Sequence, residues 1–202
     1  MRRWMACCCG LGLVACQDWR DRVSPEVVAR DPEQVLLEGV EPTIWTEGGH
    51  VIALSPRAQY RVTGYVVEIS RQLLDEWDFV VPLDVALVWG PAADPEVLKG
   101  VQFHLTSRYL SFRTKRGELI GRLRGHVSNN HLIPKSPEIA DVLDDLEIGD
   151  LVTLEGQLVD LEIKSPKGHL RHRNKSSLSR DDDGSGACEQ LWVEQVTIGP
   201  GG

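Results

Sequence analysis

The sequence predicts a mainly β protein, a small OB-like β-barrel with one helix and extra strands, with a β-sandwich as the alternative. Short apolar runs recur from Gly48 onward, separated by Gly, Pro, Asn and Ser, as in proteins built from many short strands. Two longer segments, residues 60–69 and 150–163, have apolar residues on both faces. In residues 150–163 the apolar face switches near Gly156, which indicates a strand that bends to serve two sheets.

The remaining elements follow from local patterns. Ser136 can cap a helix whose first position is Pro137, and Gly149 ends it. Its apolar stripe, at helical spacing, consists of Ile139, Val142, Leu143 and Leu146. Besides the two long segments, the predicted strands are residues 50–54, 84–89, 101–105, 109–113, 119–127 and 191–198.

Residues 1–48 differ from this β-rich region. Arg2 and Arg3 precede an apolar stretch that is too short to span a membrane, and small residues follow it. We therefore predict a lipoprotein-type signal peptide over residues 1–15; the alternatives are an ordinary cleaved signal and a start site placed too early. Residues 16–48 are rich in charge and contain three prolines, so they predict a tether to a β-barrel domain at residues 49–199.

The tetrad Leu13-Val14-Ala15-Cys16 resembles the lipobox of bacterial lipoproteins. The resemblance implies that Cys16 is acylated, becomes the mature N-terminus and holds the protein to a membrane. Three of the other cysteines, Cys7, Cys8 and Cys9, lie in the predicted signal peptide, so only Cys188 would keep a thiol and no intramolecular disulfide could form. We expect a location in the bacterial cell envelope, facing the periplasm, with the outer membrane favoured because Gln17 replaces the Asp that retains enterobacterial lipoproteins at the inner membrane.

Composition and charge narrow the function classes. The chain has 202 residues, 42% of them hydrophobic, and a net charge of -8, which excludes a disordered chain. It has no apolar run of about 18 residues, which excludes a polytopic membrane protein. Basic residues nevertheless concentrate in residues 107–124 and 164–180. These segments predict either solvated faces or contact with an anionic envelope polymer or lipid headgroup through Arg108, Arg122 and Arg171. Nucleic acid is not an expected partner, because the predicted compartment lacks it.

Four motifs resemble those of one bacterial family of secreted and lipoprotein-type proteins whose activity is not established. Residues 82–90 match its Pro-x-Asp-Val/Leu-Ala-Leu-x-Trp-Gly segment, and residues 128–134 match its Ser-x-Asn-His-Leu-Ile-Pro segment. Residues 149–159 and 176–189 match its Gly-Asp strand and its Ser-Ser-Leu-Ser/Thr-Arg-x-Asp-x-Gly-x-Gly-Ala-Cys-Glu block. Relatives usually have a Trp-rich strand where residues 170–174 stand, so the resemblance does not carry over a binding face built from those aromatics.

The residues of these motifs allow a catalytic and a structural interpretation. Cys188 could be a nucleophile with His131 as its base, which would make a cysteine-dependent cell-wall hydrolase or transpeptidase. A free Cys at the start of a strand is more often a small buried hydrophobe, and Gly186-Ala187-Cys188-Glu189 lacks the His that precedes the Cys in cell-wall transpeptidases. The favoured structural interpretation makes Ser179, Arg180 and Asp182 a pinned turn, with Asn130 and His131 at strand ends opposite it.

No metal or cofactor is expected, because the chain has no glycine-rich phosphate loop and too few well-spaced ligands for zinc. We predict that the functional surface lies around His131 and Asp182, because the motifs at residues 128–134 and 176–189 place Asn, His and Asp side chains there. The sequence therefore predicts a non-catalytic envelope binding or accessory module. The alternatives are the cysteine enzyme and a structural subunit that docks an envelope protein. The predicted binding residues are Asn130, His131, Ser179, Arg180, Asp182, Arg108, Arg122 and Arg171.

Overall fold

The computed structural model describes residues 18–71, 75–179 and 187–199 and is mainly β, as predicted. Its strands are β1 (Glu33–Leu36), β2 (Thr43–Glu47), β3 (His50–Ser70), β4 (Leu83–Val88), β5 (Val101–Thr106), β6 (Tyr109–Thr114), β7 (Val127–Pro134), β8 (Leu151–Lys164), β9 (Leu170–Asn174) and β10 (Glu189–Ile198). The α-helices are α1 (Pro95–Gly100), α2 (Ile120–Leu123) and α3 (Pro137–Asp144). Short 3-10 turns are η1 (Trp19–Asp21), η2 (Pro25–Val28), η3 (Gly90–Ala93) and η4 (Gly117–Leu119).

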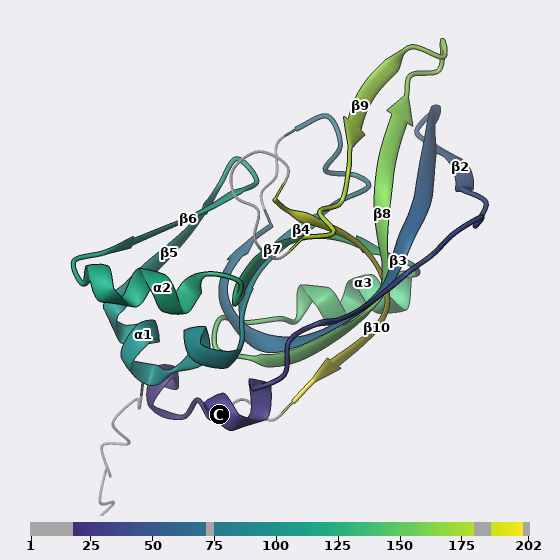
Figure 1. The fold of residues 1–202 in the computed structure, drawn as a ribbon. Coiled ribbons are helices and arrows are strands. Elements are labelled where there is room, and N and C mark those ends of the chain that lie inside the picture. Colours follow the sequence, from purple (N-terminus) through teal and green to yellow (C-terminus); the bar gives the residue numbers. More distant parts are fainter. Residues whose placement is uncertain (1–17, 72–74, 180–186, 200–202) are drawn as a thin grey trace, which may run out of the picture.

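Most strands belong to one large mixed sheet with the order β1-β3-β4-β7-β10-β8-β9, in which β2 pairs with β3. The long strand β3 also pairs with β8, so the pairings run from β3 through β4, β7, β10 and β8 back to β3. β7 and β10 are parallel, and their neighbours in this sheet pair antiparallel. β5 and β6 form a separate hairpin, which lies with α1 and α2 to one side of the large sheet (Figure 1).

The predicted change of apolar face in residues 150–163 is confirmed in β8. Val152, Leu154 and Leu158 face the larger hydrophobic cluster, whereas Val159 and Leu161 face a second, smaller one. The switch falls between Leu158 and Val159, opposite an irregularity in β3 between Pro56 and Ala58. Gly156, two residues earlier, lies against β10, where a β-carbon would be 2.0 Å from the carbonyl oxygen of Trp192. A residue without a side chain therefore lets the backbones of β8 and β10 approach closely.

The tether predicted for residues 16–48 needs correction over its described part. Residues 18–48 contain β1 and β2, which pair antiparallel with residues 58–61 and 50–54 of β3, and Val28 is buried in the larger core. The local sequence predicted a tether because its prolines and charges interrupt every apolar run. The pairing depends instead on the unusual length of β3, which offers backbone hydrogen bonds to two further strands.

Two other local predictions were wrong. Residues 119–127, expected as a strand, form the end of η4 and the helix α2. Asn130 and His131, expected at strand ends, lie in the middle of the buried strand β7. The structure therefore has α1 and α2 besides the single predicted helix, which is α3 with Ser136 as its cap. Among the described residues, no helix is long and apolar enough to cross a membrane.

Candidate functional site

A cavity of about 310 Å³ lies beside His131, and five separate segments build it. The loop before β4 contributes Asp75 and Trp77, and the tip of the β5–β6 hairpin contributes Arg108. β7, β9 and the residue before β10 complete the lining with His131, His172, Arg173, Asn174 and Cys188, together with the hairpin residues Ser107 and Tyr109. We call this hollow the His131 cavity.

A buried ionic network forms its inner wall. Arg108 Nη1 donates to Asp84 Oδ1 at 3.0 Å, and His131 Nδ1 lies 2.7 Å from the same oxygen. The other guanidinium nitrogens of Arg108 bind the Asp75 carboxylate, and one of them also donates to the Val81 carbonyl. Burial of Asp75 raises its pKa, but the hydrogen bonds and charge of Arg108 outweigh this, so the pKa of Asp75 is lowered overall. The network thus fixes the position of both His131 and the hairpin tip.

The backbone at the hairpin tip is strained. Ser107 and Arg108 have φ angles of 49° and 67°, in the left-handed region, where a non-glycine residue costs on the order of 1 kcal/mol. Such two-residue hairpin turns usually contain Asn-Gly or Gly-Gly. Here the contacts of the Arg108 side chain and a hydrogen bond from Asn129 Nδ2 to the Arg108 carbonyl, 2.8 Å long, hold the turn. Backbone strain next to a cavity is a common feature of functional sites.

Stacked rings form the outer wall. The Arg108 guanidinium lies 3.9 Å from the centre of the Trp77 ring, and the His172 ring stacks on Trp77 at 4.0 Å. His131 meets Trp77 edge-on at 5.6 Å between ring centres. Partial burial lowers the pKa of His172, which keeps its ring neutral at neutral pH. These contacts join β9 to the loop before β4 across the cavity.

Cys188 faces the same cavity. The parallel register pairs Glu189 with Asn130, which places Cys188 beside Asn129, and Asn129 Nδ2 lies 3.3 Å from the Cys188 sulfur. Because side chains alternate along a strand, His131 is on the same face of β7 as Asn129. The structure therefore brings together the two residues that the sequence nominated as nucleophile and base.

The remaining predicted binding residues are distributed differently. Asn130 is fully buried and donates to the Val85 carbonyl and to Ser128 Oγ, so it stabilises the β4–β7 pairing rather than lining the cavity. The backbone N–H of Ser179 donates to Ser177 Oγ in a turn. Cys16, Arg180 and Asp182 lie outside the described residues.

The three arginines do not form one exposed surface. Arg108 is buried in the network, whereas Arg171 on β9 pairs with Glu76 outside the His131 cavity. Arg122 on α2 binds Asp94 and Glu96 near α1. Each of the three guanidinium groups is thus paired with at least one carboxylate of the chain.

Sequence reasoning missed Asp84, Asp75 and Trp77. The sequence could have indicated Asp84, because it is an acidic residue within an apolar strand and a buried carboxylate needs a partner. The partner could not be named, because Arg108 lies 24 residues further along the chain. Asp75 and Trp77 occupy a loop whose sequence carries no comparable signal.

Among the described residues, no group of three or more His, Cys, Asp and Glu side chains is arranged to hold a metal ion. The chain matches no known protein family, no curated protein and no solved structure.

Proposed function

We propose that this chain is a bacterial envelope lipoprotein, anchored through Cys16, whose OB-like β-barrel binds a ligand in the His131 cavity. The barrel is supported by the pairings that return from β8 to β3, by the parallel pairing of β7 with β10, and by the position of α3 between β7 and β8. An OB fold is a five-stranded, partly open barrel with Greek-key connections.

The position of the cavity carries the binding proposal. In the proposed barrel, β3 and β4 are the first two strands and β8 and β10 the last two. The His131 cavity lies between two connections: the loop from β3 to β4, and the segment from β8 to β10, which contains β9. OB folds take their ligands between these two loops, on the face of the second and third strands. The Asp75, Asp84 and Arg108 network holds the cavity wall rigid, which reduces the ordering cost of binding.

The phosphate of a lipid headgroup is the ligand chemistry we propose for this cavity. Arg173 and Asn174 line it on β9, within the basic segment 164–180. Arg173 Nε and Nη2 donate to Glu162 Oε2, so Arg173 Nη1 and the Asn174 amide are the donors that we assign to the phosphate. An acylated Cys16 would hold the domain close to anionic headgroups, which raises their effective concentration.

We expect glycerol 1-phosphate, used as the headgroup probe, to bind the full chain saturably in calorimetric titrations. Asn174→Trp should weaken binding at least tenfold, because the indole would fill the cavity. Thr46→Trp, which adds the same ring at an exposed position on β2, is the matched control and should bind like the wild type. Equal affinities of the two variants would contradict the proposal.

The anchor has its own test. Mass spectrometry of the protein from membranes of a producing bacterium should find Cys16 as the N-terminal residue, carrying two or three acyl chains. Cys16→Ser should leave the chain unacylated and release it from the membrane fraction, because stable anchoring needs two or more chains. An unprocessed N-terminus in the membrane fraction would contradict the anchor.

One observation favours a second candidate function, a cysteine-dependent acyl hydrolase. Asp84 lies 2.7 Å from His131 Nδ1 and would orient the imidazole as the carboxylate of a catalytic triad does. His131 would take the Cys188 proton, and the thiolate would attack an acyl carbonyl and expel the amine or alcohol, which receives that proton. Water would then hydrolyse the thioester and restore the thiol. The hydrogen bond from Asn129 stabilises the thiolate form.

The pH dependence of Cys188 alkylation distinguishes the two functions. For an activated thiol, reaction with iodoacetamide, followed on the Cys188 peptide by mass spectrometry, should have its midpoint well below the ordinary value of about 8.5. His131→Asn should return the midpoint to about 8.5, whereas His104→Asn, at an exposed position on β5, should not. A wild-type midpoint at the ordinary value would eliminate the enzyme and leave the binding module.

A further inference from the structure

A second surface, separate from the His131 cavity, is lined by aromatic side chains. It consists of two adjoining hollows of about 540 and 620 Å³ that share Glu47 and Phe79 in their linings. We call it the aromatic groove. The loop before β4 separates it from the cavity, because Trp77 lines the cavity and Phe79 lines the groove. On β9, His172 likewise lines the cavity, whereas Arg171 lines the groove.

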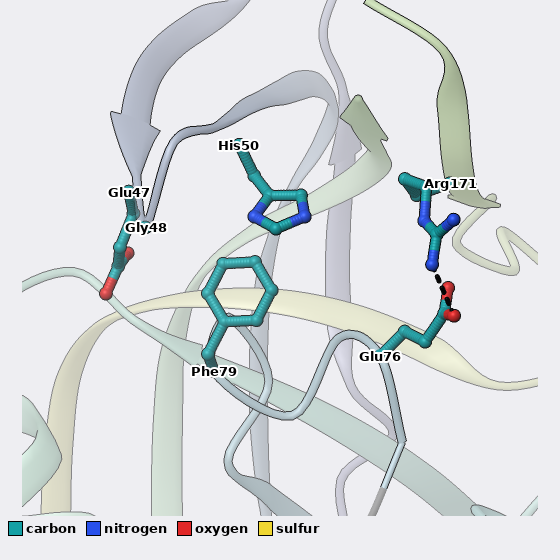
Figure 2. Close-up of a pocket in the computed structure, with 6 residues that line it drawn as sticks. All are labelled: Glu47, Gly48, His50, Glu76, Phe79 and Arg171. Carbon is teal, nitrogen blue, oxygen red and sulfur yellow. Dashed lines mark hydrogen bonds and ion pairs between the residues drawn. The ribbon is translucent and has the colours of Figure 1, made fainter. Parts of the chain in front are cut away.

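The groove has aromatic rings along its length. Trp45 and Trp192 line the first hollow with Phe79, which is 37% exposed. In the second hollow the His50 ring lies 5.5 Å from Phe79, and Figure 2 shows these rings between Glu47 and the Arg171–Glu76 ion pair. The two tryptophans cover the smaller core but remain partly exposed. Partly exposed rings in a hollow of this size are typical of ligand sites.

The polar groups of the groove come from regular positions on the strands. Thr43, Trp45 and Glu47 alternate along β2, so they face the same side, whereas Ile44 between them is 63% exposed and does not line the groove. Glu47 Oε2 accepts from Trp45 Nε1 at 3.2 Å, which fixes the indole. The groove therefore combines fixed aromatic rings with carboxylate and hydroxyl groups at its edge.

The charges of the lining balance. Glu47 and Glu76 contribute two negative charges, and Lys135 and Arg171 contribute two positive ones. Arg171 pairs with Glu76 at 2.5 Å, and Lys135 pairs with Glu194 at 2.8 Å while lying over the Trp192 ring. An anionic polymer would therefore meet two carboxylates without an unpaired cation among these lining residues, which disfavours nucleic acid and polyphosphate.

We propose that the aromatic groove binds an uncharged glycan chain. Sugar rings have apolar faces that pack on aromatic rings, and their hydroxyl groups both donate and accept hydrogen bonds. Hydroxyl donors satisfy Glu47 and Glu76, which can only accept. A proline-rich peptide would also pack on the rings, but its backbone offers mainly acceptors, so it would give Glu47 and Glu76 no donor beyond the Trp45 indole and the Arg171 guanidinium that already bind them. The two adjoining hollows fit an extended chain rather than a single sugar.

The linear tetramer of N-acetylglucosamine is the probe, titrated into the full chain by calorimetry with tryptophan fluorescence as a second readout. We expect saturable binding and a change in tryptophan emission. Trp45→Ala should weaken binding about tenfold, because an aromatic stacking contact of this kind is worth roughly 1.4 kcal/mol. Ile44→Ala, its neighbour on the opposite face of β2, is the matched control and should keep the wild-type affinity. Phe79→Ala provides a second groove variant if Trp45→Ala unfolds.

Three results would overturn this inference: no saturable binding of the tetramer, equal binding by Trp45→Ala and Ile44→Ala, or tighter binding of a galacturonic acid tetramer or of decaproline. The probe is soluble and the groove is separate from the His131 cavity. Asn174→Trp and Cys16→Ser should therefore bind the tetramer like the wild type, so failure of the envelope or cavity proposals is distinguishable from failure of this one.

Discussion

Replacing Gly156 with alanine is expected to destabilise the domain by about 3 kcal/mol or to prevent folding. The added methyl group would lie 2.0 Å from the carbonyl oxygen of Trp192 and 3.1 Å from the backbone nitrogen of Glu194. Both contacts are with backbone, so no side chain can rotate away. Relief requires β8 and β10 to separate at their pairing of Gly156 with Val193, where both cores meet. Urea denaturation followed by tryptophan fluorescence measures the loss.

Gly121→Ala is the matched control for this substitution. Gly121 lies in α2, and a β-carbon there would meet no atom within 4 Å. Because alanine favours helix and restricts the unfolded chain, we expect a gain of about 0.5–1 kcal/mol. A loss of stability in Gly121→Ala as large as that in Gly156→Ala would mean that the close crossing of β8 and β10 is not the cause.

Replacing Asp84 with alanine is expected to cost about 3–5 kcal/mol of stability. Asp84 is fully buried, and its Oδ1 atom binds both Arg108 and His131. Among the described residues, its removal leaves the buried guanidinium with Asp75 and the Val81 carbonyl as acceptors, and it removes the partner of His131 Nδ1. The strained turn at Ser107 would lose part of the contact that holds it. The midpoint of urea denaturation should fall accordingly.

Glu33→Ala removes a carboxylate whose side chain is 64% exposed and whose ion pair with Arg61 is long, at 3.8 Å, so it should leave stability almost unchanged. Asp84→Asn keeps the shape of the side chain and should lose less than Asp84→Ala. Equal stability of Asp84→Ala and Glu33→Ala would show that the network is not required for folding. The same variants, tested for Cys188 alkylation, separate a positioning role of Asp84 from a purely structural one.

Local sequence patterns predicted secondary structure correctly where the signal lies within a single helix or strand. The helix after Ser136 was predicted from its cap and its apolar stripe, and the face switch in residues 150–163 from alternation alone. Residues 128–134 were not predicted as a strand, because Asn129, Asn130 and His131 are polar, yet they belong to β7. Residues 119–127 have the apolar share of a strand, but α2 forms within them. Polar residues usually indicate an exposed position, but these are buried because their hydrogen-bond partners lie on other elements.

The candidate site was predicted only in part for the same reason. His131, Cys188 and Arg108 were named from their chemistry, and the structure places all three around one cavity. The aromatic groove was not predicted, because Trp45, Phe79 and Trp192 are far apart in the sequence and stand in unrelated patterns. Aromatic residues at such separations give no periodic signal.

The sequence by itself determined the β-rich class, the capped helix and the change of apolar face in residues 150–163, because each depends on residues close together in the chain. Only the tertiary structure decided that residues 18–48 pair with β3, that Asp84 binds Arg108 and His131, and that Cys188 lies beside Asn129. These contacts depend on strand register, which joins residues tens of positions apart and is set by the packing of the whole sheet.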